Sequence, residues 1–214
     1  MKNLRNGNIL PQYLKEILIG VLLGDAHITK SEKNNAYIKF EQGIKNQEYL
    51  LFIYELFKDY AINIPTEYKR FDKRYSKENI SFSFRTKSLN EFNEFADIFL
   101  KLNENNKTIK IVPKNIFNLL TPCSLAFWIM DDGQEVKTRG ITQGITLCTD
   151  SFTYVEVLTL KSVLETKFGF NCSIHNKNIK KGYFRIYISK LSMPLLRSIV
   201  NEYMHSSMLY KIGL

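Results

Sequence analysis

LIGVLLGDA at residues 18–26 and LAFWIMDDG at residues 125–133 are the most informative segments of this sequence. Upstream of the first, apolar residues recur three or four positions apart, which predicts a helix that begins at Pro11 and ends at Asp25. The second follows a threonine and a proline, a typical N-cap and first-turn residue, and predicts a helix that ends at residues 131–133. Each half of the chain therefore carries one apolar helix that ends in acid.

The elements that follow each helix repeat in the same order. Both halves read α-β-β-α-β-β-α, which predicts an α+β fold of two pseudo-symmetric αββαββα repeats. We assign residues 1–102 to the N-terminal repeat, 103–120 to a polar connecting segment and 121–214 to the C-terminal repeat. The expected ranges are β-rich stretches 37–40, 66–74 and 80–85 with helices 47–60 and 88–101 in the first half, and β-rich stretches 144–149, 171–176 and 183–189 with helices 152–168 and 193–204 in the second.

Composition narrows the class of protein. Hydrophobic residues make up 44% of the 214 positions, which excludes a disordered chain. The longest apolar run, residues 17–24, is shorter than the about 20 residues that a bilayer span needs, and no signal peptide is visible, so we expect a soluble intracellular protein. The 30 Lys and Arg exceed the 21 Asp and Glu by nine, which favours nucleic acid as the partner. The richness in Lys, Asn and Ile suits an AT-rich organellar or bacterial genome.

The cysteines and histidines do not indicate a zinc site. Cys123, Cys148 and Cys172 are widely spaced and form no CxxC pair, and the three histidines are equally scattered. We expect the cysteines to be reduced residues of the core.

The two motif acids are the strongest candidates for chemistry. Asp25 and Asp132 occupy the same place in each repeat, so a pseudo-twofold axis would bring both carboxylates to one end of a helix pair. Two close carboxylates suit Mg²⁺, which takes oxygen ligands and keeps several waters. Gly20 and Gly24 would allow close approach of the second helix, with Phe127 filling the groove, although a local helix weakness is the alternative. An acid that only ends a helix is the alternative for each Asp, but the macrodipole disfavours it there.

A lysine also recurs after the last helix of each half. Lys110 and Lys211 could lie beside phosphates as point charges or position a water molecule. An ordinary solvated lysine is the alternative for each position.

Positive charge concentrates on the β-rich stretches, whereas the acids favour the helices. A sheet with helices on its back and a basic, aromatic-rich front fits the major groove of DNA, which is about 12 Å wide. The alternative is a solvated loop surface. The candidate DNA-binding residues are Lys39, Lys69, Arg70, Lys73, Arg74, Arg85, Arg139, Lys177, Lys180, Lys181 and Arg185.

The two quoted motifs resemble those of single-chain LAGLIDADG homing endonucleases of the mitochondrial intron-encoded type. The resemblance implies a monomer in which two antiparallel four-stranded sheets form a saddle along double-stranded DNA, with the motif helices at the centre. It implies that Asp25 and Asp132 hold metal, that Gly24 and Asp131 add a backbone carbonyl or second contact, and that Lys110 and Lys211 form the basic active-site pair. Mg²⁺ is the expected cofactor, with Mn²⁺ as a substitute and Ca²⁺ as an ion that binds without supporting cleavage.

These features predict a Mg²⁺-dependent, site-specific endonuclease that makes a staggered cut in both DNA strands, located in the mitochondrion or another AT-rich compartment. An RNA maturase that binds intron RNA and a DNA-binding protein that does not cleave stay open as alternatives. Both motif acids are present, which favours cleavage over either. Gly24 and Asp131 occupy one motif position with different residues, and Phe127 replaces a usually small packing residue. We therefore expect an asymmetric helix interface and unequal cutting of the two half-sites.

Overall fold

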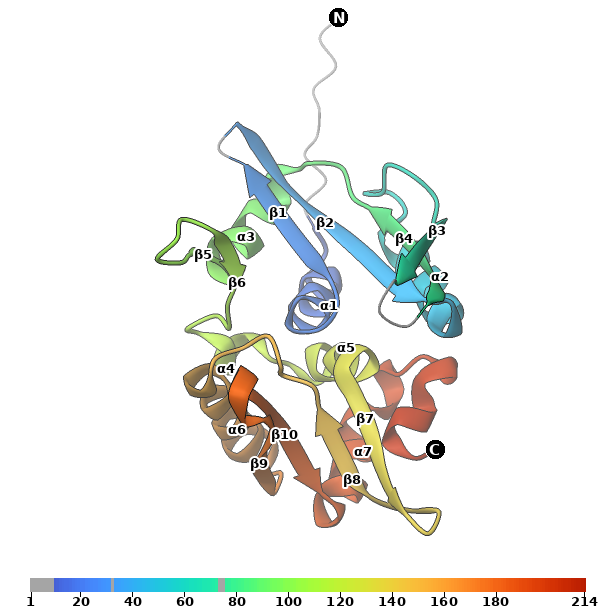
Figure 1. Cartoon of the computed structure of the whole chain (residues 1–214), viewed down its shortest axis with the longest axis vertical. Helices are drawn as coiled ribbons and strands as arrows, with labels where there is room; N and C mark the ends of the chain where they lie inside the picture. Colours follow the sequence, from blue (N-terminus) through green and yellow to red (C-terminus); the bar gives the residue numbers. More distant parts are fainter. Residues whose placement is uncertain (1–9, 32, 73–75) are drawn as a thin grey trace, which may run out of the picture.

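The computed structural model describes residues 10–31, 33–72 and 76–214, and it contains two similar halves arranged about a central helix pair (Figure 1). Each half has a four-stranded antiparallel sheet, with strand order β1-β2-β4-β3 in the first and β7-β8-β10-β9 in the second. The predicted α+β class and the αββαββα order are confirmed. The first half comprises α1 (Gln12–Leu23), β1 (His27–Ser31), β2 (Asn34–Gly43), α2 (Gln47–Phe57), β3 (Thr66–Asp72), β4 (Lys77–Arg85) and α3 (Asn93–Phe99). The second comprises α5 (Pro122–Asp132), β7 (Gly133–Thr138), β8 (Ile141–Leu147), α6 (Tyr154–Phe168), β9 (Cys172–Asn178), β10 (Tyr183–Ser189) and α7 (Met193–Val200).

Helices α1 and α5 pack against each other at the centre of the molecule (Figure 1). A Cβ atom on Gly20 would lie 2.2 Å from the Ser124 carbonyl oxygen and 2.8 Å from Phe127 Cβ, so the glycine allows the two backbones to approach closely. The Thr121 hydroxyl accepts a hydrogen bond from the Ser124 N–H at 3.2 Å and caps α5, as the sequence predicts. The predicted helix interface, with Phe127 packed against Gly20, is confirmed.

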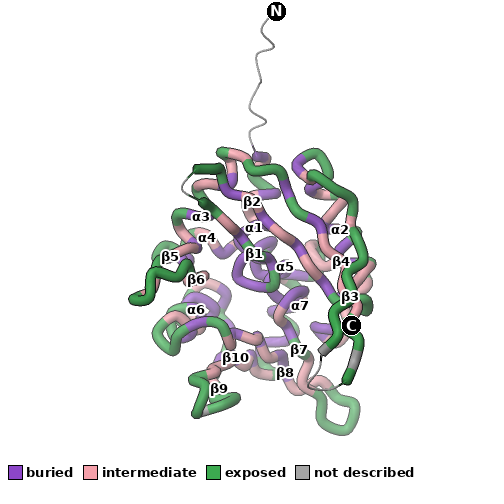
Figure 2. Tube along the Cα trace, turned by 45° about the horizontal axis from the view of Figure 1, so that its top comes forward, coloured by how far each residue is buried: buried purple, intermediate pink, exposed green. Residues whose placement is uncertain are grey.

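Each sheet has one face against helices and one open face. On β2, Ala36, Ile38, Phe40 and Gln42 are buried, while the alternate residues between them are partly exposed. On β10, Ile186 and Ile188 are buried in the same way. This alternation of buried and exposed positions follows from the two-residue period of a strand, and Figure 2 shows the buried residues gathered along the central helices.

Two segments differ from the ranges that the sequence predicts. The helix expected at 88–101 starts after a 3₁₀ turn at Asn90–Phe92 and ends at Phe99, because the chain enters a short strand, β5 (Leu100–Leu102), that pairs with β6 (Thr108–Lys110). The polar residues between these strands form the hairpin turn, in which the Asn103 side chain accepts from the N–H groups of Asn105 and Lys107. Alternating apolar residues on both sides of a polar run could have indicated this hairpin.

The other difference lies at the end of the chain. The helix expected at 193–204 ends at Val200, and two 3₁₀ segments follow, η5 (Asn201–Tyr203) and η6 (Ser206–Ile212). The backbone extends between them at Met204 and His205, and the His205 ring caps η6 by accepting from the Ser207 N–H at 3.3 Å. This turn returns the chain toward α5, which brings Lys211 to the end of that helix. A short helix α4 (Ile116–Leu119) precedes α5.

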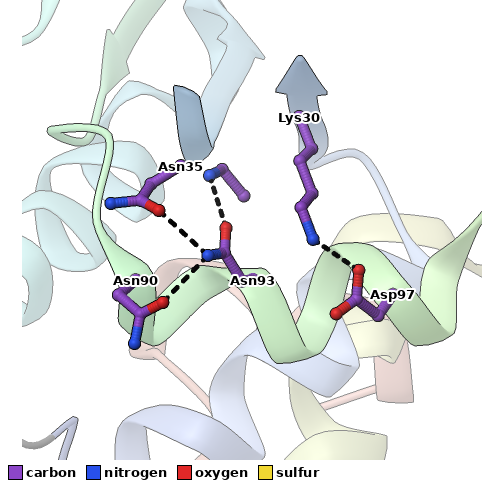
Figure 3. A network of polar contacts seen from close by, with 6 residues as sticks. Lys30, Asn35, Asn90, Asn93 and Asp97 are labelled. Carbon is purple, nitrogen blue, oxygen red and sulfur yellow. Dashed lines mark hydrogen bonds and ion pairs between the residues drawn. The ribbon is translucent and has the colours of Figure 1, made fainter. Parts of the chain in front are cut away.

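A polar network ties the first hairpin to α3 (Figure 3). The Asn93 carboxamide oxygen accepts from the Ala36 N–H at 2.8 Å, and its amide group donates to the side chains of Asn35 and Asn90 at 3.0 Å each. The Lys30 ammonium pairs with Asp97 at 2.6 Å in the same region. These contacts hold the β1–β2 hairpin in place over the helix.

The helices in the described part of the chain lack the combined length and apolar character that crossing a membrane requires. Cys123 and Cys172 are buried, Cys148 is partly exposed, and the three thiols are unpaired. Burial raises the pKa of both the Cys123 and the Cys172 thiol to about 12, so these thiols stay protonated as core residues do.

Candidate active site

The two motif acids meet at one end of the central helix pair. Asp25 follows α1 and is exposed, whereas Asp132 is the last residue of α5 and is half-buried. Asp131, the residue before it, is 9% exposed. Because α1 and α5 pack side by side, the carboxyl ends of both helices lie at the same place, as the repeat predicts. Three carboxyl groups therefore share one small region where the helix macrodipoles are also negative.

The two recurring lysines make equivalent contacts with these helix ends. Lys110 Nζ, on β6, donates to the Gly24 carbonyl oxygen at 2.6 Å, and Lys211 Nζ, in η6, donates to the Asp131 carbonyl oxygen at 2.7 Å. Gly24 and Asp131 hold the same position of the two motifs, so the pseudo-symmetry extends to this contact. A cation at each carboxyl end offsets both the macrodipole and the nearby acids. Neither lysine is an ordinary solvated side chain.

Burial and mutual repulsion shift the ionisation of the cluster. Burial, with the neighbouring Asp25 carboxylate, raises the pKa of Asp132 to about 7, although Lys110 and Lys211 oppose the shift. The same two causes raise the pKa of Asp131 well above its usual range, with Asp132 as a further neighbour. Burial lowers the pKa of both lysines, while the three acids act against that shift. Ionised carboxylates are therefore unfavourable in this site, and a bound cation would stabilise them.

Sequence reasoning missed two residues of this centre. Gln42 is 6% exposed, and its Nε2 donates to Asp25 Oδ2 at 2.9 Å and to Asp131 Oδ1 at 3.3 Å. A polar residue at the inward position of an alternating strand, after Ala36, Ile38 and Phe40, was the signal that could have found it. Tyr49, on α2, is fully buried and its hydroxyl has no hydrogen-bond partner among the described residues. Burial, followed by the nearby Asp131 carboxylate, raises the pKa of that hydroxyl well above its usual range.

The donor set suits a hard divalent cation. Asp25 and Asp132 offer carboxylate oxygens, and Gly24 and Asp131 offer carbonyl oxygens beside them. Within the described ranges, no group of three or more His, Cys, Asp or Glu side chains could by itself hold a metal ion. A cation here would need water or substrate oxygens as further ligands. Mg²⁺ usually keeps such ligands, whereas a structural zinc ion takes all of its ligands from the protein.

On the first sheet, strand register places three of the four basic candidates that the structure describes on the open face. Lys39 lies opposite Arg85, and Arg70 lies opposite Asn79, on the face of the sheet that points away from Phe82 and Phe84. The Arg85 guanidinium lies 5.2 Å from the centre of the Tyr37 ring. Lys69 lies opposite Ile80, on the helix side of the sheet, so the structure does not bring it to this face. Lys73 and Arg74 lie outside the described residues.

The open face of the second sheet carries its cations differently. Arg185 lies on that face opposite His175, and its guanidinium donates to both carboxylate oxygens of Asp150, at 2.8 and 2.5 Å. Tyr187 stacks on the His175 ring beside it, with ring centres 5.2 Å apart. The remaining predicted cations lie at or near the tips of the hairpins: Lys177 near the end of β9, Lys180 and Lys181 between β9 and β10, and Arg139 in the β7–β8 turn.

Two acid-ended helices packed between two open-faced sheets, with a lysine on each motif carbonyl, form a pseudo-symmetric two-motif architecture. Residues 15–196 match the LAGLIDADG DNA endonuclease family, and the chain belongs to that family. The predicted family and fold are thereby confirmed.

Individual relatives cover nearly the whole chain. A protein named cytochrome b mRNA maturase bI2 from Saccharomyces cerevisiae is 33% identical over 97% of this chain, which spans 49% of that relative's length. A probable intron-encoded endonuclease 1 from Wickerhamomyces canadensis is 34% identical over 95% of this chain and 85% of its own. Among solved structures, the homing endonuclease I-WcaI bound to its DNA recognition sequence is 33% identical, with a TM-score of 0.83 over 96% of this chain and 88% of that one.

Proposed function

We propose that the protein is a homing endonuclease that binds a long double-stranded DNA site and makes a staggered cut in both strands with the help of a divalent metal ion. The observation that carries the proposal is the meeting of Asp25 and Asp132, one from each repeat, beside two lysine-bound carbonyls. Family membership and the likeness to a homing endonuclease solved with its DNA support the same activity.

DNA binding belongs to the open faces of the two sheets. We assign one half-site to the N-terminal repeat, residues 1–102, and the other to the C-terminal repeat, residues 121–214, with residues 103–120 as the connection. Lys39, Arg70 and Arg85 contact the first half-site. Arg185 and the tip residues of the β7–β8 and β9–β10 hairpins contact the second. Side chains on a curved sheet can reach base edges in the major groove, while lysines at hairpin tips meet phosphates.

The chain's own residues hold and polarise the reacting groups. Asp25 and Asp132 would bind the metal through their carboxylates, and Gly24 and Asp131 through their carbonyl oxygens. A bound divalent metal supplies positive charge at the scissile phosphate and lowers the pKa of an attacking water. Lys110 and Lys211, already fixed at the carbonyls, add charge beside the phosphates. Mg²⁺ is the proposed cofactor, Mn²⁺ a substitute, and Ca²⁺ an ion that supports binding without cleavage, because its looser coordination activates water less.

An RNA maturase is the second candidate, since two relatives of this chain are named mRNA maturases, of which the chain covers 49% and 75%. Binding of intron RNA would not require three crowded carboxyl groups beside two lysines bound to the helix ends. The cost of keeping three acids together therefore favours cleavage over RNA binding alone. An organellar location and a monomer, with both motifs in one chain, complete the proposal.

A randomised DNA library tests the proposal directly. The protein is incubated with the library in Mg²⁺, in Ca²⁺ and in EDTA, and the cleaved ends are sequenced on both strands. We expect one long preferred site with a staggered cut in Mg²⁺, retention of the same sequences without cleavage in Ca²⁺, and no cleavage in EDTA. If the protein retains DNA but no metal ion supports its cleavage, it is a DNA-binding protein and not an endonuclease. Cleavage in EDTA would exclude a metal-dependent mechanism.

A further inference from the structure

The Asp131 carboxylate lies in the second motif, yet the donors to it among the described residues belong to the first half of the chain. The backbone N–H of Asp25 donates to Asp131 Oδ2 at 3.1 Å, and Gln42 Nε2 donates to Asp131 Oδ1 at 3.3 Å. The buried Tyr49 hydroxyl, from α2, lies close to the same carboxyl group. The side chain of Asp131 therefore reaches across the helix interface into the opposite repeat.

Gly24 provides the space for this side chain. A Cβ atom on Gly24 would lie 2.5 Å from Asp131 Cβ and 2.6 Å from Asp131 Oδ2, closer than a Cβ atom approaches a non-bonded atom in folded proteins. The two residues that differ at one motif position are thus complementary: one repeat lacks a side chain where the other repeat inserts one. The difference between Gly24 and Asp131 therefore allows α1 and α5 to pack closely at their carboxyl ends.

The hydrogen bonds around Gln42 have a fixed direction. Asn46 Nδ2 donates to Gln42 Oε1 at 3.0 Å, which leaves the Gln42 amino group to face acceptors. That group donates to Asp25 Oδ2 at 2.9 Å and to Asp131 Oδ1 at 3.3 Å. Asp131 thereby holds Asp25 twice, through the backbone N–H of Asp25 and through the shared amide of Gln42. An acceptor at position 131 is required, because a donor there would face another donor.

We propose that Asp131 is a positioning residue that aligns the Asp25 carboxylate of the opposite repeat for the cleavage proposed above. This role rests on the proposed function and adds to it a task for the Asp131 side chain, distinct from the contact of its carbonyl. It also assigns Gln42 as the relay between the two acids. Because both contacts converge on Asp25, loss of the acceptor disturbs the first motif's acid although the substitution lies in the second motif.

The Asp131→Asn variant tests this role because it keeps the shape and removes one acceptor. We expect at least a tenfold loss in cleavage rate, a several-fold higher Mg²⁺ concentration for half-maximal rate, and DNA affinity in Ca²⁺ within about twofold of the parent. Asp97→Asn, the same exchange at the exposed ion pair on α3, serves as the control and should leave all three quantities unchanged. A purely structural role would instead lower DNA affinity and thermal stability without changing the Mg²⁺ dependence.

A double-variant cycle tests the packing without any need for cleavage. Gly24→Ala should lower the melting temperature of the parent, and it should cost much less in an Asp131→Gly background, where the opposing Cβ is gone. Equal costs in both backgrounds would overturn the complementarity. If the parent cleaves DNA and Asp131→Asn cleaves equally well at the same Mg²⁺ concentration, this positioning role fails alone. If the parent cleaves no DNA, the proposed function fails and the role fails with it.

Discussion

The two repeats have the same backbone plan but carry different side chains at their equivalent positions. Lys110 and Lys211 bind equivalent carbonyls in the two motifs, at 2.6 and 2.7 Å. Those carbonyls belong to Gly24 in one repeat and Asp131 in the other, so one motif leaves space and the other fills it. Pseudo-symmetry therefore fixes where the reacting groups stand, and individual side chains make the two halves of the centre unequal.

The sheet faces differ in the same way. On the first sheet, Arg85 packs over the Tyr37 ring and keeps its charge available on the open face. On the second, Arg185 is bound by Asp150 through two hydrogen bonds, which raise the pKa of its guanidinium further and neutralise its charge locally. Lys39 on the first sheet also pairs with Glu41, so the contrast is between the two arginines. Among the described residues Arg85 has no carboxylate partner, and we expect it to meet its half-site as a free cation and Arg185 to meet the other as a paired one.

The largest effect should come from removing either motif acid. Asp25→Asn and Asp132→Asn should each slow double-strand cleavage by about 10³-fold or more, because metal charge stabilisation is worth several kcal/mol and each 1.4 kcal/mol is tenfold. DNA affinity measured in Ca²⁺ should stay within about tenfold, since phosphate contacts elsewhere supply most of it. Cleavage of target plasmid at the parent rate by either variant would remove that acid from the site.

Without a bound metal ion, the half-buried Asp132 carboxylate should lower the free energy of unfolding at neutral pH. Asp132 has a folded pKa of about 7, above its unfolded value, so the folded state binds the extra proton and stability falls as pH rises from about 4 to about 7. Asp132→Asn removes this titration and should stabilise the protein in EDTA by about 2 to 4 kcal/mol above pH 7, with little difference near pH 4. Urea melts at pH 4.5 and 8 check it; a pH-independent difference would contradict the assigned shift.

Substitution of either lysine should slow cleavage less than loss of a motif acid. Comparing the Lys110 and Lys211 variants shows whether the two lysines have equivalent roles. Lys110→Met and Lys211→Met should each slow cleavage by about 10²-fold, the usual cost of losing one charge-stabilising donor. Since each lysine serves one motif end, each variant should impair one strand more, and nicked DNA should accumulate. Strand-resolved kinetics measure these effects. If both variants cut both strands at the parent rate, the two lysines have only a structural role.

The smallest effects should come from substitutions on the sheet faces that are proposed to recognise DNA. Arg85→Ala should cost about 1 to 3 kcal/mol of binding and relax base preference in one half-site only. Asp150→Asn should release Arg185, strengthen binding to unrelated DNA and steepen the salt dependence by about one unit. Salt titrations and cleavage-specificity profiles of both variants measure these effects. A change of preference throughout the target by Arg85→Ala would contradict separate reading of the two half-sites.

The sequence predicted the features that repeat and missed those that depend on tertiary contacts. Two apolar stretches, each ending in acid, predicted the helix pair and the meeting of Asp25 with Asp132, because periodicity and spacing are local properties. Gln42 was missed, since its partners lie 17 and 89 residues away along the chain. Strand register likewise separates Lys69 from Arg70, which composition treats alike. The β5–β6 hairpin was hidden because its turn resembles a polar linker.

Anomalous diffraction from crystals of the protein with its cleavage site and Mn²⁺ tests most directly the claim that the two motif ends form one metal-dependent centre. We expect manganese peaks at the carboxyl ends of α1 and α5, in contact with the carboxylates of Asp25 and Asp132 and with oxygens of the scissile phosphates. Manganese bound elsewhere, or cleaved DNA at that position without a metal contact to either acid, would contradict it.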